Sequence, residues 1–218
     1  MRLYLASDVL GNFSQELIKL IGDNRKTLFI TNARDYKTPE ARLESINGDI
    51  KSFTEAGLDV HELDLRPYFG KADELRDYVQ AFNPGLIFCA GGNLFLLSTA
   101  LKKSGMDNII REGLASDSFV YGGYSAGSMN ASKDLQNYND SYAARVDRYS
   151  EAMSVYGDVC TDGLGLIDEY ICPHADRDKF SSSCATAVKT LSERGLTPIA
   201  LSDPEVYIVN GENERIYK

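Results

Sequence analysis

The chain has 218 residues, of which 43% are hydrophobic and 25% charged, a composition typical of a soluble globular protein with a well-buried core. A net charge of −9 and a pI near 4.8 argue against the basic footprint that a phosphate backbone needs, so we expect no nucleic acid and no anionic membrane as partner. No apolar run reaches the roughly 18 residues that span a bilayer, and the first residues turn acidic too early for a signal peptide, so we expect a cytoplasmic protein.

Short apolar runs alternate with longer amphipathic stretches through the first 130 residues. The predicted strands are 3–6, 27–31, 60–65, 86–90 and 118–121, and the predicted helices are 39–56, 71–82, 94–103 and 108–114. Strands that alternate with crossover helices form a parallel sheet. We therefore predict a doubly wound α/β fold, with a mostly parallel sheet and helices on both faces. No linker or repeat interrupts the pattern, so we expect a single domain over residues 1–218.

The second half of the chain begins with a polar segment, 132–161, which shows no sustained periodicity. Loops of that length are usually functional. A strand at 170–172, a helix at 178–194 and a strand at 198–201 follow. Asn210-Gly211 then separates two β-rich runs, 206–209 and 215–217, which predicts a C-terminal β-hairpin.

A serine bounded by glycines follows the strand predicted at 118–121. Gly123-Tyr124-Ser125-Ala126-Gly127 fits G-x-S-x-G, the strand-to-helix elbow that lifts a serine hydroxyl clear of a sheet. Glycine in a strand costs roughly 0.5–1 kcal/mol relative to alanine, so close backbone approach is needed to explain it. In such an elbow the amide of Ala126 points to the place where an oxyanion forms. The alternative interpretation is an ordinary glycine-bounded turn.

Only two histidines are available as a base for Ser125. His61 alternates with aliphatic residues on a predicted strand, and we interpret it as a surface or strand-packing residue. His174 follows the strand at 170–172, at the edge where open α/β sheets bind ligands, and Pro173 stiffens the chain before it. We therefore favour His174 as the general base over a histidine that only hydrogen-bonds a loop.

A catalytic triad also needs a carboxylate to orient the imidazole. The residues alone do not choose among eight candidates: Asp140, Asp147, Glu151, Asp158, Asp162, Asp168, Asp203 and Glu205. A second glycine cluster, Gly91-Gly92-Asn93, opens a predicted helix and can expose amides to an anion, which makes it a candidate second oxyanion donor. The cysteines form no CxxC pair and the histidines lie far apart, so no metal and no organic cofactor is expected.

In these motifs the sequence resembles the peptidase E family of serine peptidases, which includes aspartyl dipeptidases and cyanophycinases. Members combine a G-G-G-N motif, a G-x-S-A-G elbow and a P-H or Q-H histidine; here these read AGGN, GYSAG and PH, within about residues 86–205. The resemblance implies a fold like the class I glutamine amidotransferases. It also implies Ser125 as nucleophile, His174 as base, and the amides of Gly92 and Ala126 as the oxyanion hole.

For the acid, the resemblance offers two positions. Aspartyl dipeptidases carry it in an Asn-Asp pair 15 residues after the serine, which here is Asn139-Asp140. Cyanophycinase-like members use a later segment that corresponds to Asp203. We favour Asp140 for its spacing and keep Asp203 as the alternative.

The sequence departs from the family pattern at three positions. Ala90 replaces the first glycine of G-G-G-N, Leu94 replaces a threonine, and Gln136 stands where aspartyl dipeptidases have an arginine for a substrate carboxylate. The resemblance therefore does not extend to specificity for N-terminal aspartate. The substrate-binding positions that it implies are these: Gly91, Asn93, Gln136 and Asn139.

Our first hypothesis is a serine peptidase acting on short peptides. A small-ester acyl-hydrolase of the α/β-hydrolase class shares the elbow, but the short chain and the lack of an early HGGG-like loop count against it. A binding or regulatory protein that retains the fold without catalysis is the third hypothesis, and the loss of the arginine at position 136 is compatible with it. The sequence leaves the peptide substrate and the oligomeric state open, a homodimer included.

Overall fold

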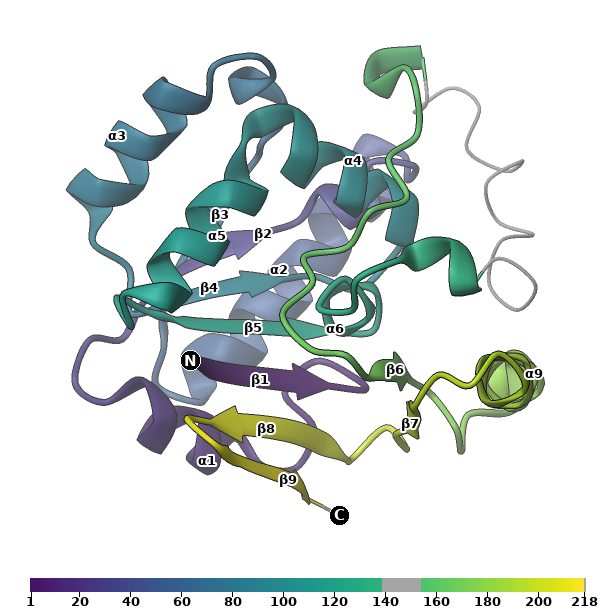
Figure 1. Ribbon diagram of the computed structural model, residues 1–218. Helices are drawn as coiled ribbons and strands as arrows, with labels where there is room; N and C mark the ends of the chain where they lie inside the picture. The colour runs from purple at the N-terminus through teal and green to yellow at the C-terminus, as the bar shows by residue number, and fades with distance from the viewer. Residues whose placement is uncertain (139–153, 218) are drawn as a thin grey trace.

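A computed structural model of the protein describes residues 1–138 and 154–217 (Figure 1). Seven strands form the main sheet in the order β3-β2-β4-β5-β1-β8-β9. They are β1 Arg2–Ala6, β2 Lys26–Ile30, β3 Asp59–Leu63, β4 Leu86–Cys89, β5 Val120–Tyr124, β8 Val206–Asn210 and β9 Asn213–Tyr217. The first five run parallel, whereas β8 is antiparallel to β1 and forms a hairpin with β9. The predicted α/β fold and C-terminal hairpin are confirmed.

Helices cover both faces of this sheet (Figure 1). They are α1 Ser14–Ile21, α2 Pro39–Glu55, α3 Ala72–Phe82, α4 Leu94–Ser104, α5 Met106–Ala115, α6 Ala126–Met129 and α9 Asp178–Glu193. Along β1, Leu3 and Leu5 face a core shared with α3, α4 and α5, while Tyr4 and Ala6 face a core shared with α1 and α2. Burial on both faces explains why these strands are continuous hydrophobic runs.

The ends of the helices follow from local capping. The Thr38 side chain accepts a hydrogen bond from the amide of Ala41 at the start of α2, and Pro39 occupies the first turn. Helix α1 was not predicted; its N-cap residue, Phe13, makes no side-chain capping bond, so the usual sequence signal is missing. The described residues also form 3₁₀ turns at η1 Asn32–Arg34, η2 Arg66–Tyr68 and η3 Leu135–Tyr138.

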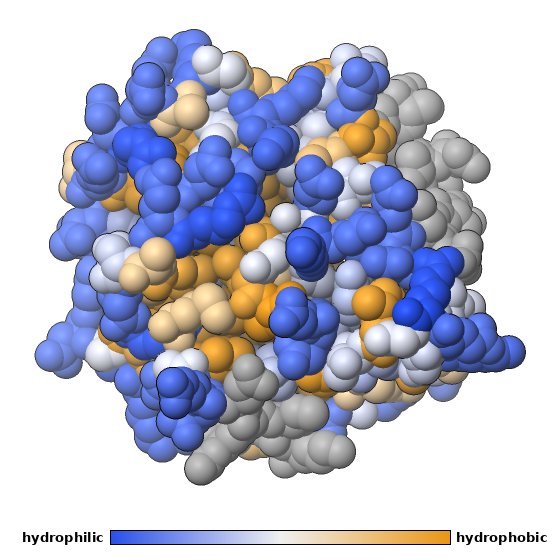
Figure 2. Space-filling view, viewed as in Figure 1, coloured by the Kyte–Doolittle hydropathy of each residue, from blue (hydrophilic) through white to orange (hydrophobic). Residues whose placement is uncertain are grey.

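Strands β6 Tyr170–Cys172 and β7 Pro198–Ala200 form a separate two-stranded parallel sheet, and α9 packs against both. The sequence pattern identifies these strands but not that they stand apart from the main sheet. Figure 2 shows mostly hydrophilic side chains on the face seen in Figure 1, with hydrophobic ones collected near its middle. Within residues 1–138 and 154–217, no helix is long and apolar enough to cross a membrane.

Strand β5 continues through two glycines to Tyr124, three residues beyond its predicted end at 121. A Cβ on Gly122 would lie 2.3 Å from the ring of Phe88 on the neighbouring strand. A Cβ on Gly123 would lie 2.5 Å from the backbone of Gly127, because the helix after the serine turns back over the strand. Close packing therefore accounts for glycine inside this strand.

Candidate active site

The serine turn lies where the carboxyl ends of neighbouring parallel strands meet. Strand β5 ends at Tyr124, which pairs with Ala6 at the end of β1. Strand β4 ends at Cys89, beside Gly123 of β5. Ser125 is therefore presented at the edge of the sheet where open α/β folds bind their ligands.

The histidine and the carboxylate reach the same edge from the last third of the chain. Strands β6 and β7 run side by side, and the segments that leave them carry His174 and Asp203. Strand β8 begins at Val206 and pairs with the end of β1, which brings the residues just before it to the sheet edge. Ser7, directly after β1, ties these segments together: its Oγ accepts a hydrogen bond of 2.8 Å from the amide of His174.

Ser125, His174 and Asp203 are joined by a chain of hydrogen bonds. Ser125 Oγ lies 2.9 Å from His174 Nε2, and His174 Nδ1 lies 2.5 Å from Asp203 Oδ1. His174 is only 5% exposed, so its ring is fixed by these contacts and by the Phe180 ring 5.1 Å away. With Nδ1–H donated to the carboxylate, Nε2 is the nitrogen able to accept the serine proton.

The backbone at the serine is that of a tight elbow. Ser125 has φ of 50° and ψ of −114°, a conformation that non-glycine residues avoid and that costs of order 1–3 kcal/mol. Hydrogen bonds hold the strained turn: Ser128 Oγ donates to the carbonyls of Ala6 at 2.7 Å and Gly123 at 2.8 Å. A Cβ on Gly127 would lie 2.2 Å from the Cys89 carbonyl oxygen, so glycine is needed after the serine as well.

The second glycine cluster lies directly against Ser125. A Cβ on Gly91 would come within 3.0 Å of the Ser125 Cβ, and one on Gly92 within 2.3 Å of the Ala33 carbonyl oxygen. Gly92 also has φ of +150°. Among the described residues, no backbone or side-chain acceptor is found for the amide of Gly92 or for that of Ala126. Both donors are therefore available to an oxyanion beside Ser125.

The predicted substrate-binding positions separate into two groups. Gly91 and Asn93 lie beside the serine, although the Asn93 side chain is engaged in capping α4 through the amides of Phe95 and Leu96. Gln136 instead donates from Nε2 to Thr161 Oγ1 at 3.0 Å, and it does not line the cavity at Ser125. That cavity, about 30 Å³ in volume, is lined by Gly92, Asn93, Leu94, Phe95, Ser125, Met129, His174 and Phe180.

Of the two candidate acids, the structure describes only Asp203. Asn139-Asp140 lies outside the described residues, so the structure does not place the favoured carboxylate. The alternative, Asp203, is the carboxylate that bonds to His174. Partial burial acts to raise the pKa of Asp203, but the hydrogen bond from His174 and the charges of His174 and Arg177 outweigh it, so that pKa lies below its ordinary value.

A buried polar network behind the elbow was not predicted. Asp49 on α2 accepts hydrogen bonds of 2.6 Å from Arg34 Nη2 and from the Tyr124 hydroxyl. Arg34 also bonds to the Tyr124 hydroxyl, and its Nε donates to the Gly91 carbonyl at 3.4 Å. Burial raises the pKa of Asp49 despite these partners. The network therefore links the residue before Ser125 to the glycine loop.

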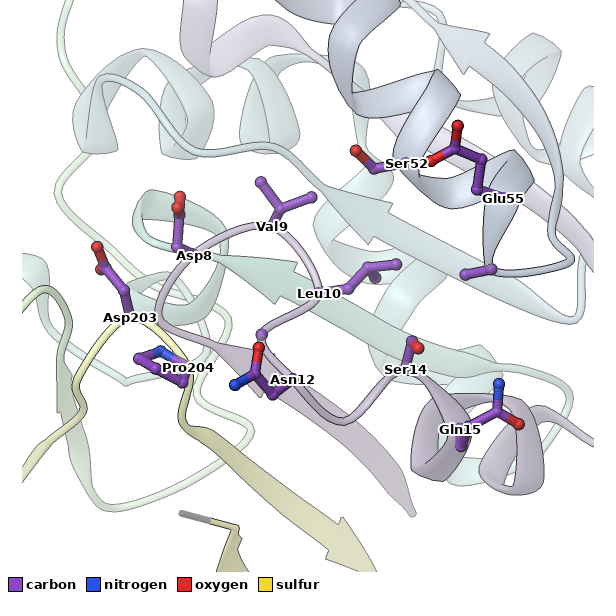
Figure 3. A pocket seen from close by; sticks show the side chains of 12 residues that line it. Asp8, Val9, Leu10, Asn12, Ser14, Gln15, Ser52, Glu55, Asp203 and Pro204 are labelled. Atoms are coloured by element: carbon purple, nitrogen blue, oxygen red, sulfur yellow. The ribbon is translucent and has the colours of Figure 1, made fainter.

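A larger cavity, of about 580 Å³, adjoins Asp203 on another side (Figure 3). Neither Ser125 nor His174 lines it. Its walls are Asp8, Val9, Leu10, Gly11, Asn12, Ser14, Gln15, Ser52, Glu55, Ala56, Asp203 and Pro204. In the part of the chain that the structure describes, no group of three or more His, Cys, Asp or Glu side chains is arranged to hold a metal ion.

The chain is similar to known peptidases. The sequence profile of Peptidase family S51 matches residues 5–216. An uncharacterized peptidase of Listeria innocua, Lin0382, is 28% identical over 166 residues, which cover 74% of this chain and 71% of that protein.

Solved structures share the fold. A candidate peptidase E from Listeria monocytogenes superposes with a TM-score of 0.74 at 22% identity, over 100% of this chain and 98% of that one. A peptidase from an acI-B1 actinobacterium gives a TM-score of 0.67 at 18% identity, over 99% of this chain and 86% of that one. Identities this low establish the α/β architecture and carry no information on substrates.

Proposed function

Since the chain belongs to peptidase family S51, we propose that it is a serine peptidase that hydrolyses short peptides through Ser125, His174 and Asp203. The observation that carries the proposal is the chain of hydrogen bonds, 2.9 Å and 2.5 Å long, that joins these side chains. The elbow backbone and the two available amides of Gly92 and Ala126 support it.

In the proposed reaction, Ser125 Oγ attacks the scissile carbonyl carbon while His174 Nε2 takes the hydroxyl proton. The amides of Gly92 and Ala126 stabilise the negative oxygen of the tetrahedral intermediate. The imidazolium, stabilised by the Asp203 carboxylate, then gives its proton to the leaving amine. A water molecule, deprotonated by His174, attacks the acyl-enzyme and releases the second product with Ser125 restored.

The proposal is tested by labelling with a fluorophosphonate probe, which reacts with an activated serine and does not depend on peptide specificity. We expect labelling of the wild-type protein and none of Ser125→Ala. Ser116→Ala is the matched control, because Ser116 is exposed before the start of β5, and its hydroxyl contacts the end of α5 and Ser118, away from Ser125. Unchanged labelling of Ser125→Ala would rule this serine out as the reactive group.

A peptide library analysed by mass spectrometry, with a parallel panel of small esters, separates the proposal from its alternatives. Cleavage of short peptides that disappears in Ser125→Ala supports the peptidase. Turnover of esters alone favours an acyl-hydrolase. A folded protein that cleaves neither and takes up no probe favours a binding protein.

A further inference from the structure

We infer that Arg177 is a positioning residue for the proposed reaction: it fixes the Asp203 carboxylate against His174 and compensates its charge. The inference rests on the proposed function for its catalytic consequence, but the coupling between Arg177 and the His174 ring can be measured independently of any activity. Nothing in the sequence motifs points to this arginine, because it lies outside the elbow, the glycine loop and the P-H pair.

Arg177 and His174 contact different oxygens of the Asp203 carboxylate. Arg177 bonds to Oδ2 through Nε at 2.6 Å and through Nη2 at 2.5 Å. The other oxygen, Oδ1, lies 2.5 Å from His174 Nδ1 and 3.3 Å from Ser7 Oγ. A carboxylate held on both oxygens cannot rotate without breaking a charge-assisted hydrogen bond, so its orientation toward the imidazole is set by the guanidinium.

The guanidinium is itself anchored. Its Nη2 lies 2.7 Å from Asp8 Oδ2, in the loop after β1, and the Arg177 amide donates to the His174 carbonyl at 3.3 Å. Figure 3 shows Asp8 and Asp203 at the same end of the large cavity, the two carboxylates that Arg177 bridges. Desolvation acts to lower the pKa of Arg177, but the charges and hydrogen bonds of Asp8 and Asp203 together outweigh it and raise that pKa, so the guanidinium stays charged.

The charged side chains near His174 and Asp203 lie on several segments of the chain. The carboxylates are Asp8, Asp176, Asp203 and Glu205, and the cations are Arg177 and Lys179. Lys179 lies over the Phe180 ring, 5.5 Å from its centroid, whereas Arg177 contacts Asp203 directly. Removal of Arg177 therefore leaves the negative charges of Asp8 and Asp203 uncompensated, which favours the imidazolium over the neutral base.

The experiment compares Arg177→Met, Arg177→Lys and Arg76→Met. Methionine retains the length of the side chain without its charge, and lysine retains the charge without the planar fork. Arg76→Met is the matched control, because it removes an exposed arginine–carboxylate pair with Glu112, between α3 and α5. Peptide cleavage is measured as kcat and KM across pH, and the ring signals of His174 and His61 are titrated by NMR.

For Arg177→Met we expect kcat to fall roughly 10- to 100-fold while KM changes less than about threefold, since a misplaced catalytic group affects the chemical step. The acid limb of the pH profile and the midpoint of the His174 titration both move to higher pH. Arg177→Lys restores the titration midpoint but only part of kcat, and Arg76→Met matches the wild type. His61, whose side chain is 50% exposed, is the internal control and should not move.

An unchanged His174 titration in a folded Arg177→Met protein overturns the inference, as does a loss confined to KM. If the protein cleaves nothing and takes up no probe, the proposed function fails. The NMR titration then still decides whether Arg177 sets the charge of the His174–Asp203 pair.

Discussion

Ser125 and His174 meet at 2.9 Å, and both side chains are carried on backbone with positive φ, 50° and 65° respectively. Neither conformation is one that a serine or histidine adopts by preference, and each costs of order 1–3 kcal/mol. The strain is tolerated because neighbouring segments hold both residues, Ser128 at the elbow and Ser7 at the histidine. The geometry of this pair is therefore a property of the surrounding fold as much as of the two side chains.

Asp203→Asn should lower kcat by roughly 10²- to 10⁴-fold with little effect on KM, because an amide cannot stabilise the imidazolium and favours the wrong tautomer. Asp140→Asn is the informative comparison, since family spacing singles out that aspartate. We expect it to retain activity within about threefold of the wild type. A large loss in Asp140→Asn together with an active Asp203→Asn would assign the acid to Asp140.

Gly92→Ala should reduce kcat by roughly 10²- to 10³-fold, the usual effect of losing one oxyanion donor. The added Cβ would lie 2.3 Å from the Ala33 carbonyl oxygen, so the loop must shift its amide away from Ser125. Gly22→Ala is the control, because Gly22 also has positive φ, 76°, but open space around it. A Gly92→Ala enzyme with normal kcat would exclude this amide from the oxyanion hole.

Arg34→Met should destabilise the protein by about 3–5 kcal/mol, since it leaves the buried Asp49 carboxylate without its ion pair. Asp49→Leu combined with Arg34→Met should be less destabilising than Arg34→Met alone, because both charges are then removed. Urea denaturation of the single and double variants measures this coupling. If the losses in free energy of unfolding of the two single variants simply add in the double variant, Arg34 and Asp49 are not energetically coupled.

The pH dependence of unfolding offers a separate test of Asp203. Its pKa is lower in the folded protein than in the unfolded chain, so Asp203 contributes stability above an ordinary carboxyl value of about 4 and loses it as pH falls through the lower folded value. The difference in free energy of unfolding between wild type and Asp203→Asn should therefore be constant above about pH 5, and it should narrow as pH falls from there through the lower folded pKa of Asp203. A difference in free energy of unfolding that stays constant with pH would contradict a lowered pKa of Asp203 in the folded protein.

The sequence predicted those parts of the site that depend on short motifs and on residue types that are rare in the chain. The elbow follows from G-x-S-x-G after an apolar strand, and His174 could be proposed because only one other histidine exists. That other residue, His61, lies on β3 with its ring near Asp59, as a surface interpretation predicts.

The carboxylate that bonds to His174 could not be chosen from the residues alone, because its position depends on pairing between distant strands. Asp203 reaches His174 only through the pairing of β8 with β1 and of β6 with β7. Arg34 and Arg177 were missed for the same reason: each acts through partners far away in the chain, Asp49 with Tyr124, and Asp8 with Asp203. Spacing rules describe helices, turns and hairpins, and carry no signal for such contacts.

The pairing of β8 with β1 joins the beginning of the chain to its end. A nascent chain that has emerged only as far as Ser125 can form the elbow, but His174 and Asp203 are still unsynthesised or inside the ribosome. The Ser125 hydroxyl then has no imidazole beside it to accept its proton. The hydrogen-bonded set of Ser125, His174 and Asp203 is therefore completed only when the segments that follow β6 and β7 have left the ribosome and folded.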